Sequence, residues 1–214
     1  MKTKKILLYS TLIFSFFMTL VLYPSLPSKV PIHFNYRWEP DQYGGKYSIL
    51  IMGIAPILIA LIIDVFYKRD EKYQNQKRYD KTRNIIQLII VCLVLMIQWI
   101  SILIAMNKDY NFEQIMPVMI GIFFIALGNY LPKVRHNYWV GIRLPWTIMS
   151  EKTWKKTHRL GGYLFVLHGF ICMLSGVMLN EAYKKIVVIC LASILCLLAV
   201  YSCFIYIQEK KEKK

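Results

Sequence analysis

Long apolar runs and short polar segments alternate along this chain. The six apolar runs cover roughly Ile6–Tyr23, Ser48–Phe66, Ile85–Met106, Gln114–Leu131, Leu160–Leu179 and Ile186–Ile207. Each run is close to the ~20 residues that a helix needs to cross the ~30 Å hydrocarbon core of a bilayer. No formally charged side chain lies near the middle of any run. The pattern predicts an all-α integral membrane protein with six transmembrane helices.

The first apolar run follows Lys2, Lys4 and Lys5, as the apolar core of a signal peptide would. It is longer than such a core usually is, and Tyr-Pro-Ser-Leu-Pro at residues 23–27 follows it in place of a small-residue cleavage site. We therefore interpret this run as an uncleaved first span.

The basic residues predict the orientation of the spans. The N-terminus, the 67–84 loop, the 132–159 loop and the C-terminal tail together hold 21 of the 27 Lys and Arg residues, and the opposite side holds 6. Because cytoplasmic loops of membrane proteins are enriched in Lys and Arg, both termini are predicted to be cytoplasmic. The 132–159 loop then faces the cytoplasm, and the 24–47 loop faces outward.

Composition agrees with the membrane class. The 214 residues are 57% hydrophobic and 18% charged, against about 25% charged in a typical soluble domain. The net charge of +15 is clustered between apolar runs, so it does not indicate direct nucleic-acid binding. The five cysteines all fall inside apolar runs, and we predict neither a disulfide nor a cysteine metal site.

The loops divide the chain into three predicted parts. Residues 1–66 hold the first two spans and an extracellular cap at 24–47, residues 67–84 form a charged cytoplasmic loop, and residues 85–214 hold four spans. The 67–84 loop has no Gly or Pro and is interpreted as helical extensions of its neighbours. The 107–113 and 180–185 connections are predicted to be tight hairpins.

The cytoplasmic 132–159 segment is rich in polar side chains. Trp139 and Trp146 are interpreted as anchors at headgroup depth. Arg143 is a candidate to bind a lipid phosphate or a carboxylate such as Glu151, and its replacement by alanine is expected to reduce the amount of folded protein. Asn129 has two open roles, a helix-ending hydrogen bond or a specific structural contact.

An amphipathic helix is predicted after Thr147 or Ser150, either of which is a suitable N-cap. It would lie on the inner leaflet and lead into the fifth span. Its basic residues share one face, which predicts attraction to anionic lipids; they are Lys152, Lys155, Lys156 and Arg159. Thr153, Trp154 and Thr157 lie on the other side.

No catalytic motif is found in the sequence. His158 is expected at the membrane surface, and His168, inside the fifth span, is interpreted as a packing residue. We therefore predict no catalytic residue, no cofactor and no enzymatic activity. Two alternatives stay open: a transporter or channel using Gln87, Gln98, Asn129 and His168, and a membrane enzyme using Arg143, Glu151, His158 and Arg159.

The outward 24–47 segment is predicted to form a small folded cap. Prolines stiffen an extended, strand-like piece at 26–35, and Gly44-Gly45 is interpreted as a turn. His33 and Asp41 are too few to predict a metal site.

Both polar segments carry spaced motifs. The outer one reads Leu-Pro-x-x-x-Pro-x-His-Phe-Asn with a later Asp and Lys, at Leu26, Pro27, Pro31, His33, Phe34, Asn35, Asp41 and Lys46. The inner one is matched at Gly128, Asn129, Pro132, Lys133, Asn137, Gly141, Ile142, Arg143, Pro145, Trp146, Thr147, Glu151, Trp154, Thr157, His158 and Arg159. The chain departs from the usual form of these motifs at two places. The outer motif commonly has a glycine at the position of Arg37-Trp38, and the inner motif usually has threonine at the position of Leu144.

These motifs resemble the SdpI family, including its YfhL-like members, together with the N-terminal domain of unknown function that accompanies it. The resemblance implies a bacterial membrane protein that gives immunity to a secreted, membrane-active peptide toxin such as the sporulation-delaying toxin of bacilli. It also implies a possible second role, which is to hold a cytoplasmic transcriptional repressor at the membrane. The matched residues of the two motifs are the expected binding or structural sites.

Overall fold

The structure is a computed structural model that describes residues 2–69, 77–106, 110–138, 140–178 and 180–212. Its elements in chain order are α1 (Lys2–Leu22), η1 (Tyr23–Ser25), β1 (Lys29–Phe34), β2 (Pro40–Gly45), α2 (Ser48–Arg69), α3 (Lys77–Ala105), α4 (Phe112–Tyr130), η3 (Leu131–Lys133), α5 (Pro145–Met149), α6 (Glu151–Met178) and α7 (Glu181–Glu212). Six of these helices are long and apolar enough to cross a membrane, which confirms the predicted fold class.

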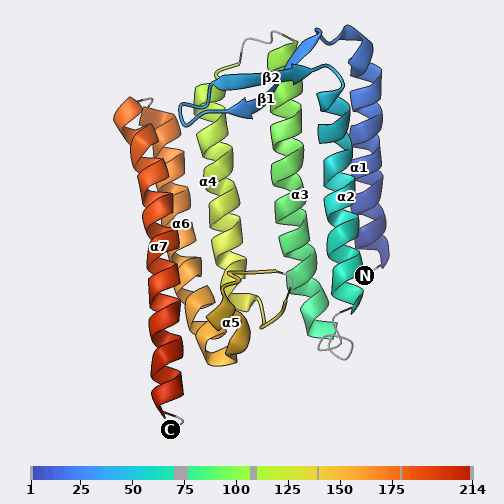
Figure 1. Cartoon of the computed structure of the whole chain (residues 1–214). Coiled ribbons are helices and arrows are strands. Elements are labelled where there is room, and N and C mark those ends of the chain that lie inside the picture. Colours follow the sequence, from blue (N-terminus) through green and yellow to red (C-terminus); the bar gives the residue numbers. More distant parts are fainter. Residues whose placement is uncertain (1, 70–76, 107–109, 139, 179, 213–214) are drawn as a thin grey trace.

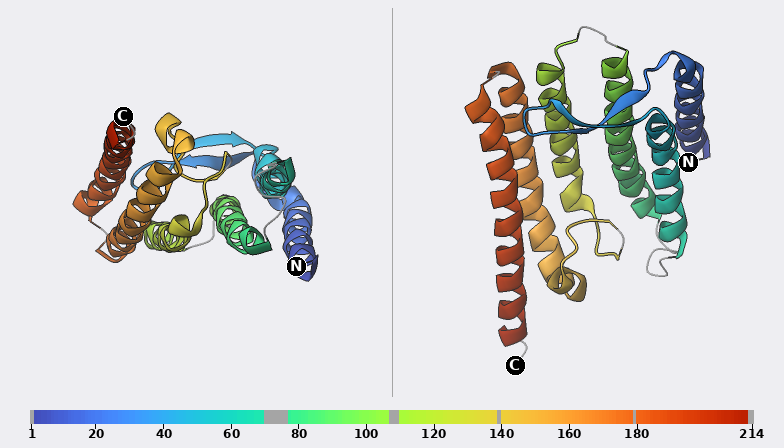
Figure 2. Two further views of the ribbon diagram at one scale, coloured as in Figure 1. Left: turned by 90° about the horizontal axis from the view of Figure 1, so that it is seen from below. Right: turned by 45° about the horizontal axis from the view of Figure 1, so that its top comes forward.

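The long helices follow one another in a curved row from α1 and α2 through α3 and α4 to α6 and α7 (Figures 1 and 2). The β1–β2 hairpin lies across one end of this row, and both described chain ends lie at the other (Figure 1). The loop before α5 and the start of α6 lie at the end with the termini. We refer to the two ends as the hairpin end and the terminal end.

Large apolar side chains cover the outside of the bundle. Val177 and Val200 are each 69% exposed, and Phe14 is 63% exposed. Lipid tails are as apolar as leucine, so these side chains gain nothing by being hidden from a bilayer. Close packing and hydrogen bonds between the helices must therefore hold the bundle together.

Glycines bring the backbones of α4 and α6 into contact. A Cβ atom added to Gly169 would lie 2.6 Å from the carbonyl oxygen of Gly121, and one added to Gly128 would lie 2.6 Å from that of Gly162. Both distances are shorter than real Cβ contacts, so only glycine permits this approach. Small residues at helix interfaces have this role in membrane proteins generally.

Polar side chains tie together the helices of the first half. Asp64 of α2 accepts hydrogen bonds from Lys5 of α1 at 2.8 Å and from Tyr9 at 3.0 Å, and its other oxygen lies 3.1 Å from Arg83 of α3. Nearer the hairpin end, Gln98 of α3 donates to the Thr19 hydroxyl at 2.6 Å. No local sequence pattern indicates these contacts, because their residues come from three different helices.

Several helix boundaries differ from the predicted spans. The helix after Ser150 leads into the fifth span as predicted, and α6 runs unbroken from Glu151 through Gly161 and Gly162 to Met178. The predicted tight hairpin at 180–185 is shorter than expected, because α6 ends at Met178 and α7 begins at Glu181, where Asn180 accepts from the Ala182 N–H at 2.8 Å. On the 67–84 segment, α2 and α3 do extend as predicted, to Arg69 and from Lys77. Residues 107–109 of the predicted 107–113 hairpin lie outside the described residues, and α4 begins at Phe112.

Candidate functional site

The cap at the hairpin end is a two-stranded antiparallel sheet fixed to the helices by its base. Val30 is fully buried and packs in one cluster with Leu26, Ile49 of α2 and Ile102 of α3. The Lys46 ammonium donates a hydrogen bond to the Pro24 carbonyl at 2.9 Å, which joins the end of β2 to the segment before β1. The outer segment therefore forms a folded cap, as predicted.

The turn of the hairpin lies at Asn35–Glu39. The Asn35 side-chain oxygen accepts from the backbone N–H of Arg37 at 2.8 Å and of Glu39 at 3.2 Å. Trp38 has φ 68°, a left-handed conformation that costs a non-glycine residue about 1–2 kcal/mol. This geometry explains why glycine suits the position. The predicted turn at Gly44-Gly45 is wrong, because these residues pair with Val30 and Lys29 within the sheet.

The other predicted cap residues are divided between the surface and the base. His33 and Asp41 face each other across the strands, with Nδ1 and Oδ1 2.6 Å apart and both side chains exposed. Pro27 is exposed, Pro31 is buried, and Phe34 ends β1 half-buried. No group of three metal-ligating side chains occurs among the described residues. The His33–Asp41 pair is the most accessible polar feature of the predicted set.

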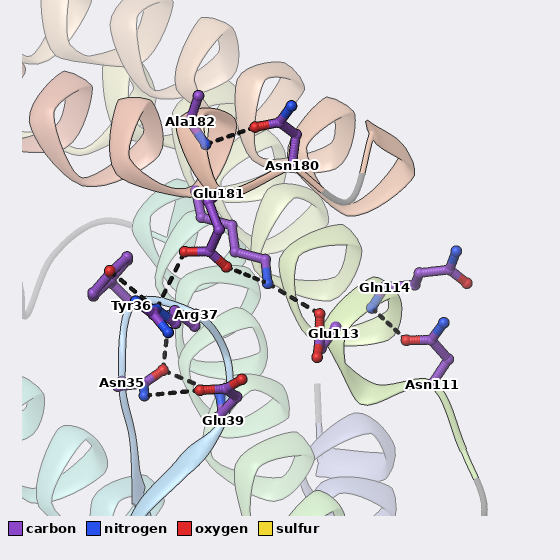
Figure 3. A network of polar contacts seen from close by, with 11 residues as sticks. Asn35, Tyr36, Arg37, Glu39, Asn111, Glu113, Gln114, Asn180, Glu181 and Ala182 are labelled. Atoms are coloured by element: carbon purple, nitrogen blue, oxygen red, sulfur yellow. Dashed lines mark hydrogen bonds and ion pairs between the residues drawn. The ribbon is translucent and has the colours of Figure 1, made fainter.

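A chain of alternating charges joins the hairpin turn to α7 and α4 (Figure 3). The Arg37 guanidinium lies 3.2 Å from Glu181, and Lys184 lies 3.3 Å from Glu181 and 3.0 Å from Glu113 of α4. The Lys184 side chain is only 4% exposed, so it is held between the two carboxylates. The Tyr36 hydroxyl and the nearby Glu181 raise the pKa of Arg37, which therefore keeps its charge. No local sequence pattern indicates this cluster, because its residues come from three distant segments.

At the terminal end, the 134–150 loop folds onto the first turns of α6. Trp154 is fully buried and donates its indole N–H to the Val134 carbonyl at 2.8 Å. Its ring is stacked on His158 at 4.0 Å between centroids, and His136 meets its edge at 5.2 Å. These rings form the core of the inner motif.

His158 fixes the loop at Gly141-Ile142. Its Nδ1–H donates to the Trp154 carbonyl at 2.9 Å, and its Nε2 accepts from the Ile142 N–H at 3.0 Å. Gly141 has φ 130°, and a Cβ there would meet both His158 and Trp154. The spacing from Gly141 and Ile142 to His158 is thus a packing requirement. His158 is fully buried, so it serves the packing of the motif.

Asn137 and Thr147 hold the shape of the loop itself. Asn137 accepts from the Val140 N–H at 2.6 Å and donates to the Val140 carbonyl at 2.8 Å. The Thr147 hydroxyl accepts from the Leu144 N–H at 2.9 Å and donates to the Ile142 carbonyl at 2.8 Å. Thr147 therefore serves the short helix α5, and Ser150 caps α6 by accepting from the Thr153 N–H at 3.0 Å.

The inner motif is also attached to α7. Trp146 is half-buried and donates its indole N–H to the Ser202 hydroxyl at 2.6 Å, so it is a packing contact in addition to any role at headgroup depth. The Ser150 hydroxyl donates to Glu209, and Lys152 forms a 2.5 Å ion pair with Glu212. Ser202 and Glu209 are missing from the predicted site. The sequence of α7 does not indicate these two residues, because Ser202 looks like any small residue in an apolar run.

The remaining motif residues are exposed. On α6, Lys152, Lys155, Lys156 and Arg159 face outward and Thr153, Trp154, Thr157 and His158 are buried, which confirms the predicted basic face. Glu151 pairs with Lys155 at 2.7 Å. Pro132, Lys133 and Pro145 are exposed as well, with Lys133 over the Tyr130 ring at 4.4 Å.

The expected role of Arg143 in folding is not supported. Its side chain is exposed, and no hydrogen bond or ion pair to it occurs among the described residues. In particular, Glu151 does not bind it. Asn129 is exposed at the end of α4 and donates to the Ile125 carbonyl at 2.9 Å, which is the helix-ending bond among its two open roles.

The residues named for the two alternative functions are not brought together. Gln87 bonds to Ala60 and Asp64, Gln98 to Thr19, and Asn129 to its own helix. His168 is buried beside Phe124 and Cys172. Of the proposed enzyme residues, His158 has both ring nitrogens occupied inside the motif, whereas Glu151 and Arg143 face outward. Neither set forms one polar path or one acid–base pair.

The fold and the two polar ends define a multi-pass membrane protein with a folded hairpin at one end and a hydrogen-bonded motif at the other. Residues 133–207 match the SdpI/YfhL protein family, and residues 11–60 match a domain of unknown function (DUF1648). The chain is 26% identical over 193 residues to the Immunity protein SdpI of Bacillus subtilis (strain 168), covering 87% of this chain and 89% of that protein. No solved structure matches the chain. These matches confirm the predicted resemblance to the SdpI/YfhL protein family.

Proposed function

We propose that this protein protects a bacterium from a secreted, membrane-active peptide toxin, without enzymatic activity. The observation that carries the proposal is the similarity to an immunity protein over 87% of the chain, which includes both candidate ends. The structure adds physical support, because each matched motif folds as a unit on the surface of the bundle. The proposed localisation is the bacterial plasma membrane.

The proposed orientation places the hairpin end outside the cell and the terminal end in the cytoplasm. The excess of Lys and Arg at the terminal end supports it. In this orientation a secreted peptide meets the hairpin first. The exposed His33–Asp41 pair and Arg37 are the polar groups that we propose it contacts.

The exposed basic residues at the terminal end are the proposed inner binding surface. Lys133, Arg143 and Arg159 belong to the family motif, yet their side chains point away from the packed loop. Positive charge at this depth attracts anionic lipid headgroups. It also suits an acidic face on a cytoplasmic repressor, which we propose as the second partner.

A toxin challenge tests the proposed function. Expression of this chain in a bacterium sensitive to the sporulation-delaying toxin is expected to restore growth at toxin doses that stop cells carrying an empty vector. Survival and membrane levels of the protein are measured on the same cultures. Full membrane levels with no protection against any peptide toxin of this class would contradict the proposal.

Replacement of Arg143 separates binding from folding. Arg143→Ala is expected to leave the free energy of unfolding within about 0.5 kcal/mol of wild type, because the side chain is exposed and unpaired among the described residues. Binding to vesicles with anionic lipid, or to the repressor, is expected to weaken. Membrane levels measured by immunoblot and binding measured by flotation check the two parts.

Thr147→Ala is the matched control for this experiment. It removes a buried hydroxyl that makes two hydrogen bonds in the same loop, so folded protein is expected to fall. If Arg143→Ala lowered the folded amount as much as Thr147→Ala, the guanidinium would have a structural role.

A further inference from the structure

One helix, α7, contacts both candidate sites. Its first turn carries Glu181, which binds Arg37 of the hairpin turn at 3.2 Å (Figure 3). Its last turns carry Ser202 and Glu209, which bind Trp146 and Ser150 of the inner motif. The two motifs, separated by about a hundred residues in the sequence, therefore share one structural neighbour.

The helix between these contacts is uninterrupted. It has 32 residues, which correspond to about 48 Å at 1.5 Å per residue, and it contains neither glycine nor proline. Sharp helix kinks occur almost always at proline, at glycine or at a local bulge. A displacement at the first turn of α7 is therefore carried to its last turns and is not absorbed within the helix.

The Arg37–Glu181 ion pair at the hairpin end is accessible to a competing ligand. The side chains of Arg37 and Glu181 are 48% and 49% exposed, and exposed ion pairs contribute little to stability. An acidic group on a ligand at the hairpin turn competes with Glu181 for the same guanidinium. By contrast, Lys184 is buried and keeps Glu113 as a partner, so α7 stays attached to α4 when Arg37 leaves.

We infer that α7 couples the hairpin turn to the inner motif. A ligand carboxylate that takes Arg37 from Glu181 detaches α7 from the hairpin, and α7 then tilts about the remaining Lys184–Glu113 pair. The resulting shift of α7 loosens the contacts from Trp146 to Ser202 and from Ser150 to Glu209. This inference rests on the proposed function for the identity of the ligand, a peptide with an acidic group, but the coupling itself is measurable without any ligand.

Hydrogen exchange of the inner loop tests the coupling in protein reconstituted in lipid nanodiscs. Arg37→Ala and Glu181→Gln are each expected to speed exchange of the Ile142 and Leu144 amides, which are hydrogen-bonded within the motif. The expected acceleration is roughly two- to fivefold, the scale of one exposed ion pair. The double variant is expected to match either single variant, because both remove the same contact.

The Asp41→Asn variant is the matched control. It removes the pair with His33 on the same hairpin and touches no residue of α7, so exchange in the inner loop is expected to be unchanged. The Arg37 and Glu39 amides report whether the hairpin turn is still folded in each variant. Unchanged inner-loop exchange in Arg37→Ala with an intact turn would overturn the coupling.

The failure of this inference can be distinguished from a failure of the proposed function. If wild-type protein protects cells and neither variant alters inner-loop exchange, the coupling is wrong and the immunity role stands. If wild-type protein gives no protection, the immunity role fails, whereas the exchange result still decides whether α7 connects the two ends.

Discussion

Gly169→Leu is expected to separate α4 from α6 and to destabilise the protein by about 3 kcal/mol or more. A Cβ at this position would lie 2.6 Å from the Gly121 carbonyl oxygen and 2.9 Å from the Ile125 backbone nitrogen. These are backbone atoms of the facing helix, so no side-chain rotation relieves the contact. Leucine has the better intrinsic helix propensity by about 1 kcal/mol, and the steric effect must exceed this gain.

The free energy of unfolding, measured by denaturant titration in mixed micelles, checks this prediction. Val177→Leu is the matched control, because Val177 lies on the same helix and is 69% exposed. It also adds bulk to α6, but toward the lipid, and a change within about 0.5 kcal/mol is expected. Equal stabilities for the Gly169 and Val177 variants would show that close backbone contact between α4 and α6 does not hold the bundle.

Trp154→Ala is expected to destabilise the inner motif by about 3–5 kcal/mol, the usual effect of removing a fully buried tryptophan. The substitution removes the ring stacked on His158 and leaves the Val134 carbonyl without its donor. The 134–150 loop is expected to become accessible to trypsin at Arg135 and Arg143. The transmembrane part is held by other contacts, so helix content is expected to change little.

Cleavage rates with trypsin, followed by mass spectrometry, measure the release of this loop. Trp154→Phe is expected to lie between wild type and alanine, because it keeps an aromatic ring and loses only the indole hydrogen bond. Lys155→Ala changes an exposed neighbour on the same helix turn and is expected to cleave like wild type at these two sites. Trypsin resistance in Trp154→Ala would mean that the loop is held mainly by Asn137 and Thr147.

Local patterns were sufficient to predict the spans and the basic face of α6. A run of about 20 apolar residues has few alternatives to a transmembrane helix, because lipid satisfies no backbone hydrogen bonds. The spacing of Lys152, Lys155, Lys156 and Arg159 follows from helix periodicity, which needs no knowledge of other segments. The structure confirms both predictions.

Predictions from local sequence patterns were wrong where contacts with distant segments decide the structure. The predicted fifth span began at Leu160, yet α6 begins at Glu151 and continues through Gly162, which packs against Pro132 and the Gly128 carbonyl. Gly44-Gly45 suggested a turn, but strand pairing with β1 places the turn at Asn35–Glu39. Arg143 suggested a buried partner, and its surroundings place it at the surface.

The sequence by itself determined the class of protein, the number of spans, the two polar motifs and the family resemblance, because each of these depends on residue types at fixed spacing along one segment. Only the tertiary structure decided which motif residues face inward. It showed that His158 accepts a hydrogen bond from the Ile142 N–H and that Ser202 accepts one from the Trp146 indole N–H. It also showed that Arg37 forms an ion pair with Glu181. Each of these contacts joins segments whose separation in space depends on how the helices pack, and no local pattern encodes that distance.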